Sequence, residues 1–89
     1  DGFNTAVGHN AGYAMSTGVK NTLLGGLSGD ALTIGNNNTA LGYMALSTSV
    51  DGDFNTAIGS SALESYEDGD GNGHNTAVGN SSQLNATTG

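Results

Sequence analysis

The sequence predicts an all-β fold, a repetitive parallel β-solenoid or β-roll, and two observations point to it. The pair Asn-Thr begins a similar pentapeptide at positions 4, 21, 38, 55 and 75, so that successive steps are 17, 17, 17 and 20 residues. A constant step of this size is typical of repeat architectures. Gly occurs 16 times in 89 residues, and because each Gly inside a helix costs about 1 kcal/mol, helices are a poor alternative. We therefore expect residues 1–89 to form a single repeat segment of five units, a fragment of a longer protein.

Each unit opens with a core of the form Asn-Thr-x-aliphatic-Gly, which we expect to form one short strand. Alternate side chains of a strand face opposite sides, so Thr and the aliphatic residue share one face, and Asn and the residue between them share the other. Thr, Val and Ile favour strands, and the closing Gly permits a turn. The five cores are Asn4–Gly8, Asn21–Gly25, Asn38–Gly42, Asn55–Gly59 and Asn75–Gly79.

The rest of each unit is expected to form a tight corner, a second short extended piece and a return loop. The second piece is most evident at residues 31–35, Ala-Leu-Thr-Ile-Gly, which resemble a further strand out of phase with the others. A linker or a disordered segment would share the richness in Gly, Asn and Ser, but it would not need to keep a constant step.

The aliphatic residues of the cores are expected to form a buried ladder. Each unit supplies only about two side chains to a core, which offset little of the conformational entropy lost when 17 residues are ordered. The chain has no Cys, so disulfides cannot compensate. We therefore expect several chains around a shared axis to bury the ladder jointly. Its members are Val7, Leu24, Leu41, Ile58 and Val78.

The Asn residues that open the cores admit two interpretations. Stacked amides can form a hydrogen-bonded ladder along the repeat axis, as in other assemblies of stacked strands. The same amides could instead bind sugar hydroxyls. The structural ladder is the favoured interpretation.

Charge and motif content exclude several functions. The formal net charge is -7, and Lys20 is the only Lys or Arg, so binding to nucleic acid or to an anionic membrane is not expected. No apolar run is long enough to insert across a bilayer. The Gly-x-Ser-x-Gly motif of a hydrolase nucleophile is absent, and we expect no enzymatic activity.

The fourth unit, which is longer than the units before it, contains the one candidate metal site. Asp68, Asp70 and Asn72 follow the spacing of the first half of a calcium loop, in which alternate oxygens surround one cation and Gly allows a sharp bend. The twelfth position, however, is Gly79 rather than the bidentate Glu of such loops. The stretch therefore predicts either a calcium site or a solvated acidic loop, and no other cofactor is expected.

The repeat resembles a known family. The pattern Asn-Thr-Ala-(Val/Ile/Leu)-Gly-x-x-Ala-Leu, clearest at Asn38–Leu46 and Asn55–Leu63, is similar to repeats of bacteriophage tail-fibre and related virion fibre proteins. It is more distantly similar to the Ser-Val-Ala-Ile-Gly head repeats of bacterial trimeric autotransporter adhesins, which are homotrimers of parallel β-rolls. The second unit departs from the pattern, with Leu23 in place of Ala and Gly29 in place of Leu.

This resemblance implies a homotrimeric structural or adhesive module of a tail fibre or another virion appendage, which spaces or presents a host-receptor-binding region. Its location would be the virion, or the extracellular side of a cell surface. Its partners would be other virion or fibre proteins and a host surface glycan or protein receptor. The alternatives are a segment of a bacterial trimeric adhesin head and, from a different class, an ice-binding β-solenoid whose stacked Thr residues face ordered water.

Overall fold

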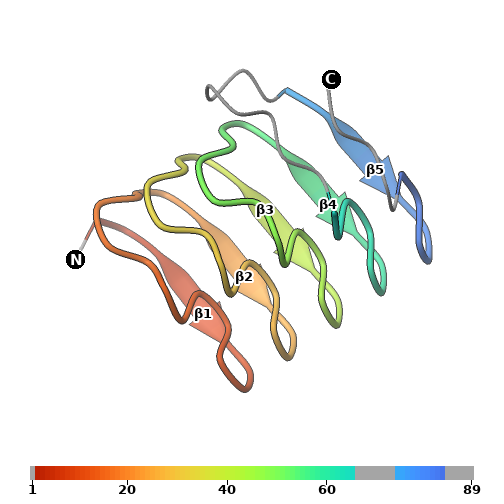
Figure 1. Cartoon of the computed structure of the whole chain (residues 1–89), viewed down its shortest axis with the longest axis horizontal. Helices are drawn as coiled ribbons and strands as arrows, with labels where there is room; N and C mark the ends of the chain where they lie inside the picture. The colour runs from red at the N-terminus through yellow and green to blue at the C-terminus, as the bar shows by residue number, and fades with distance from the viewer. Residues whose placement is uncertain (1, 66–73, 84–89) are drawn as a thin grey trace.

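The structure is a computed structural model, and it describes residues 2–65 and 74–83. Five short strands lie side by side in one parallel sheet, in the order β1-β2-β3-β4-β5. Their bounds are β1 (Thr5–Val7), β2 (Thr22–Leu24), β3 (Thr39–Leu41), β4 (Thr56–Ile58) and β5 (Thr76–Val78). Figure 1 shows that β1, β2 and β3 are each followed by a loop that returns to the start of the next strand, so the chain winds as a β-solenoid. The predicted all-β, parallel solenoid is confirmed.

The strands pair in the register that the sequence repeat predicts. The five Thr residues that begin the strands pair in order, Thr5 with Thr22, Thr22 with Thr39, Thr39 with Thr56 and Thr56 with Thr76. The last pairing spans the interval of 20 residues and keeps the same alignment. The greater length of this last interval therefore does not change the pairing register between β4 and β5.

Only one strand per coil forms in the described residues. Residues 31–35, which resemble a second strand in the sequence, adopt turns and bends instead. Leu32 is buried and Ile34 is exposed, and the backbone N–H of Thr33 donates to the carbonyl of Val50 in the next coil. The segment thus bonds to its neighbouring coil without becoming a sheet strand.

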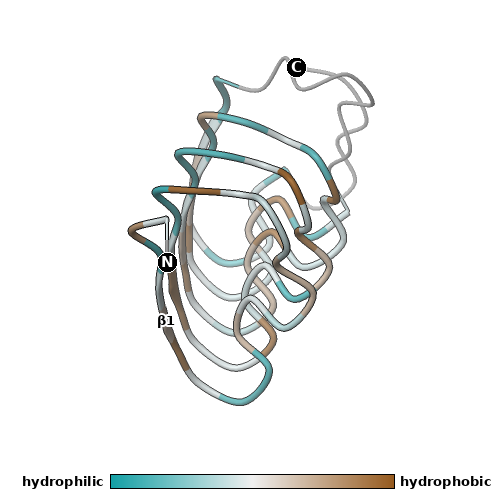
Figure 2. Ribbon diagram, turned by 90° about the vertical axis from the view of Figure 1, so that its left-hand side faces the viewer, coloured by the Kyte–Doolittle hydropathy of each residue, from teal (hydrophilic) through white to brown (hydrophobic). Residues whose placement is uncertain are grey.

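The interior of the solenoid is lined by the Asn side of each strand. The central strand residue points inward, and Leu or Ala residues from the return segment pack against it. The buried hydrophobic residues are Leu23, Leu32, Ala40, Ala45, Leu46, Ala57, Ala62, Leu63 and Ala77. Figure 2 shows the coils nested above one another, with hydrophobic stretches that recur in successive coils. The core is narrow, which explains why most of its strand positions hold Ala.

Glycine is required at the end of each strand, where the coils come closest. These residues have φ values from +126° to +135°, a conformation that side chains rarely adopt. A Cβ on Gly42 would lie 2.6 Å from the backbone of Gly59, and a Cβ on Gly59 would lie 2.6 Å from the backbone of Gly79. Glycine therefore serves both the turn and the close stacking of the backbone.

Candidate functional site

The Asn side chains form a continuous ladder inside the solenoid. We call the set Asn4, Asn21, Asn38, Asn55 and Asn75 the Asn ladder. The backbone N–H of Asn38 donates to Oδ1 of Asn21 at 2.9 Å, and Nδ2 of Asn38 donates to the same oxygen at 3.1 Å. Nδ2 of Asn38 also donates to the carbonyl of Gly52 at 2.7 Å. The Asn38 amide thereby joins its strand to the coil before it and to its own return loop, and Nδ2 of Asn21 makes the equivalent bond to the carbonyl of Gly35 at 2.8 Å.

The ladder repeats from coil to coil, which settles the choice between the two interpretations of the Asn residues. Oδ1 of Asn4 accepts from Asn21, Oδ1 of Asn38 from Asn55, and Oδ1 of Asn55 from Asn75. The side chains of Asn21, Asn38 and Asn55 are fully or almost fully buried. Buried amides with these partners satisfy the backbone and are not accessible to a sugar, so the structural ladder is confirmed.

The opposite side of the sheet carries a surface that we call the Thr–aliphatic face. Its two parallel rows are Thr5, Thr22, Thr39, Thr56 and Thr76, and Val7, Leu24, Leu41, Ile58 and Val78. The aliphatic row is accessible, since Val7 is 56 % exposed, Leu24 43 %, Leu41 42 % and Val78 66 %. The in-register pairing places like residues next to one another along each row.

One chain by itself leaves this aliphatic ladder exposed. The sequence correctly indicated that Thr and the aliphatic residue share a face, but it is the other face that points inward. The physical reason is that the Asn amides need buried backbone partners, and the narrow coil has room for Ala beside them. The signal that could have revealed this orientation is the small residue at the centre of most cores. Burial of the ladder between chains stays a prediction.

The Thr–aliphatic face carries no charge. Its strands contain only Thr, Ala, Leu, Val and Ile. The described carboxylates, Asp30, Asp51, Asp53 and Glu64, all lie in the return segments. Among the described residues, the carboxylates thus lie apart from the strands that form this face.

The predicted calcium ligands Asp68, Asp70 and Asn72 lie outside the described residues. Within residues 2–65 and 74–83, no group of three or more His, Cys, Asp or Glu side chains is arranged to hold a metal ion. Oδ1 of Asp53 instead accepts the backbone N–H of Asn36 at 2.7 Å, and thus links two return loops. His74 stacks on Phe54, with ring centroids 4.7 Å apart and planes 8° from parallel.

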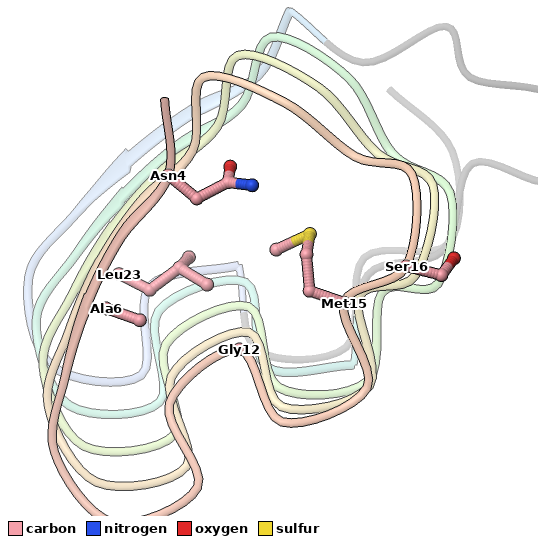
Figure 3. Close-up of a pocket in the computed structure, with 6 residues that line it drawn as sticks. All are labelled: Asn4, Ala6, Gly12, Met15, Ser16 and Leu23. Atoms are coloured by element: carbon pink, nitrogen blue, oxygen red, sulfur yellow. The ribbon is translucent and has the colours of Figure 1, made fainter. Parts of the chain in front are cut away.

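A hollow of about 330 Å³ opens at the N-terminal end of the solenoid. Figure 3 shows Asn4, Leu23 and Met15 pointing into the space that the first coil encloses, with Gly12 beneath it. Ala6 also lines the hollow and is exposed, whereas the equivalent Ala40, Ala57 and Ala77 are buried. Sequence analysis did not indicate this feature, because it arises from the position of the coil in the stack and not from any residue type.

Comparisons with known proteins add no relative: no protein-family model, curated protein or solved structure matches the chain. No helix in the described part of the chain is long and apolar enough to cross a membrane. Among the described residues, the Thr–aliphatic face is the surface feature that bears most directly on function.

Proposed function

We propose that the chain is a structural module of a homotrimeric fibre, in which copies pack through the Thr–aliphatic face. The observation that carries the proposal is the exposed aliphatic row, with Leu24 and Leu41 more than two-fifths exposed in the middle of the sheet. A contiguous apolar surface on a small soluble chain is typical of an interaction site. The resemblance of the repeat to virion fibre repeats favours three copies around one axis.

The charge distribution favours the Thr–aliphatic face over the return segments as the place where copies meet. Copies with a net charge of -7 repel one another. Contact through the return segments would bring carboxylates such as Asp30, Asp53 and Glu64 together. Contact through the Thr–aliphatic face brings together only uncharged side chains and keeps the acidic segments apart.

A regular face also suits a fibre, because every coil contributes the same pair of residues. Neighbouring copies in parallel orientation can match row to row along the whole module. Such a module would space or present a host-receptor-binding region on a virion or a cell surface, with other fibre proteins and a host glycan or protein receptor as further partners.

Sedimentation equilibrium tests this proposal with two matched variants. We expect the native chain to sediment at three times its monomer mass and Leu41→Asp to sediment as a folded monomer. The control is Ile34→Asp, because Ile34 is an aliphatic residue of similar exposure, 50 %, on the return side. It should keep the native mass. A native chain that is folded and monomeric at all concentrations would contradict the proposal.

The Thr row favours a second candidate function, the binding of ice. Stacked Thr residues recur about every 4.8 Å along a parallel sheet, and their hydroxyl and methyl groups could order water on a flat surface. The exposure of Thr5, Thr22 and Thr76 supports this candidate. Ice binding requires that the Thr–aliphatic face be uncovered in the species that contacts ice. Thermal hysteresis and ice shaping, measured for the native chain and for Leu41→Asp, would therefore distinguish the two functions. Absence of both effects would exclude it.

A further inference from the structure

We propose that the interior of the solenoid binds one water molecule between the side-chain amide of Asn55 and the hydroxyl group of Ser49. The two groups belong to successive coils, so the water joins the third coil to the fourth. Buried waters serve polar groups that have no partner in the protein itself, and they typically make about three hydrogen bonds. The site lies inside the fold and does not depend on how copies of the chain associate.

The first argument is the amide of Asn55, which departs from the rest of the Asn ladder. Nδ2 of Asn21 donates to Oδ1 of Asn4 at 3.2 Å and to the carbonyl of Gly35 at 2.8 Å. Nδ2 of Asn38 makes the equivalent pair of bonds one coil later. Asn55 is fully buried, yet its Nδ2 has no hydrogen-bond partner among the described residues. A buried donor of this kind requires an acceptor, and an ordered water supplies one.

The second argument is the hydroxyl group of Ser49. Ser49 is fully buried, and its Oγ has no hydrogen-bond partner within residues 2–65 and 74–83. The equivalent positions of the two coils before it, in steps of 17 residues, hold Met15 and Leu32. Figure 3 shows Met15 pointing into the space that its coil encloses. The third coil therefore places a small polar side chain where the first two place a large apolar one.

The third argument is geometric, because the stacking of the coils brings the two groups near one another. Sδ of Met15 lies 3.6 Å from Nδ2 of Asn21, in a contact between residues six positions apart. Ser49 and Asn55 have the same separation and occupy the equivalent positions two coils later. Oγ of Ser is bonded directly to Cβ, whereas Sδ of Met is one bond further out. Oγ of Ser49 thus stops short of the amide, and a water can accept from Nδ2 and donate to Oγ.

A crystal structure of the native chain at high resolution tests the proposal directly. We expect density for one water within hydrogen-bond distance of both Nδ2 of Asn55 and Oγ of Ser49. The internal control is Asn38, whose Nδ2 donates to Oδ1 of Asn21 and to the carbonyl of Gly52. No water should contact Nδ2 of Asn38.

Two variants of similar size test the energetic role of the water. Ser49→Met displaces the water but places a sulfur atom near the amide, as Met15 does for Asn21. Ser49→Leu displaces the water and supplies no acceptor. We therefore expect Ser49→Met to unfold at a higher urea concentration than Ser49→Leu. The matched control is Leu32→Met, which should bring no gain, because the neighbouring Asn38 already has protein acceptors.

A protein atom within hydrogen-bond distance of Nδ2 of Asn55, in the place of the water, overturns the proposal. An unfolding midpoint of Ser49→Leu equal to or above that of Ser49→Met also overturns it, since the amide would then need no acceptor at this place. Circular dichroism reports whether the two variants are folded. If they are not, the crystal structure of the native chain still decides.

Discussion

The side chain of Leu23 fills the space that the missing side chain of Gly29 leaves inside the same coil. A Cβ on Gly29 would lie 2.9 Å from Cδ2 of Leu23, and a Cβ on Gly12 in the coil before would lie 2.9 Å from its Cδ1. In the next two coils the small side chain is on the strand and the large one is in the return segment. These pairs are Ala40 with Leu46 and Ala57 with Leu63, and all four residues are buried. The two departures of the second unit from the repeat pattern therefore compensate one another.

An exchange of the large and the small side chain at positions 40 and 46 of the third coil tests this compensation. Ala40→Leu alone should destabilise the chain by about 1–3 kcal/mol through overpacking. Leu46→Gly alone should cost about 2–5 kcal/mol through the cavity it leaves. We expect the double variant to recover most of this loss, because the coil before it has Gly29 at the required position. Urea unfolding of the three variants measures the coupling free energy.

The same exchange in the fourth coil is the control. Ala57→Leu with Leu63→Gly should remain destabilised, because the coil before it has Leu46 where the new side chain needs a Gly. Recovery in both coils would contradict this account and would mean that the core adapts without a specific neighbour.

The strand-end glycines should differ in their tolerance of Ala. Gly42 and Gly79 have similar φ values, +134° and +126°, so both pay the same backbone strain when they become Ala. Within the described residues, a Cβ at position 42 would lie 2.6 Å from the backbone of the next coil, whereas a Cβ at position 79 would lie no closer than 4.0 Å to any atom, Cβ of Ser82. We expect Gly42→Ala to lower the unfolding midpoint well below that of Gly79→Ala in thermal denaturation. Equal midpoints would contradict the stacking argument.

The Asn ladder should carry much of the stability of the stack. Asn38→Ala removes the acceptor for the backbone N–H of Asn55 and the donor to Gly52 O. Each buried group left without a partner costs about 1–3 kcal/mol. We expect Asn38→Ala to unfold at markedly lower urea concentration than Asn80→Ala, since Asn80 is exposed and has no side-chain hydrogen bond in the described residues. A small effect at position 38 would mean that water replaces the amide.

Two adjacent serines should respond in opposite directions to Gly. Ser61 has φ 62°, in the left-handed region, whereas Ser60 does not have a positive φ. Relief of left-handed strain is worth about 1–2 kcal/mol, and the added chain entropy of Gly offsets about 0.5–1 kcal/mol of it. We expect Ser61→Gly to stabilise the chain slightly and Ser60→Gly to destabilise it, as measured by chemical denaturation.

The sequence predicts strand positions and register well, because Asn-Thr-x-aliphatic-Gly fixes both the alternation and the turn. It does not predict which face is buried. Hydrophobicity favours Val7 or Leu41 as core residues, but the amides of Asn21 and Asn38 can be satisfied only inside, where backbone groups of two coils converge. Residues 31–35 show the same limit: they have strand-like composition, yet Thr33 and Ile34 lie on a bend. The hollow beside Ala6 depends on the order of the coils and has no signature in any single unit.

In the proposed fibre, the register of the sheet links the length of the module to the strength of the contact between copies. One additional coil lengthens the stack by about 4.8 Å and also adds one Thr and one aliphatic side chain to each copy's outer rows. Contacts that are repeated along linked units strengthen binding multiplicatively. Insertion or loss of a coil would therefore change length and cohesion in the same step, and a longer fibre of this type would also be a harder one to pull apart.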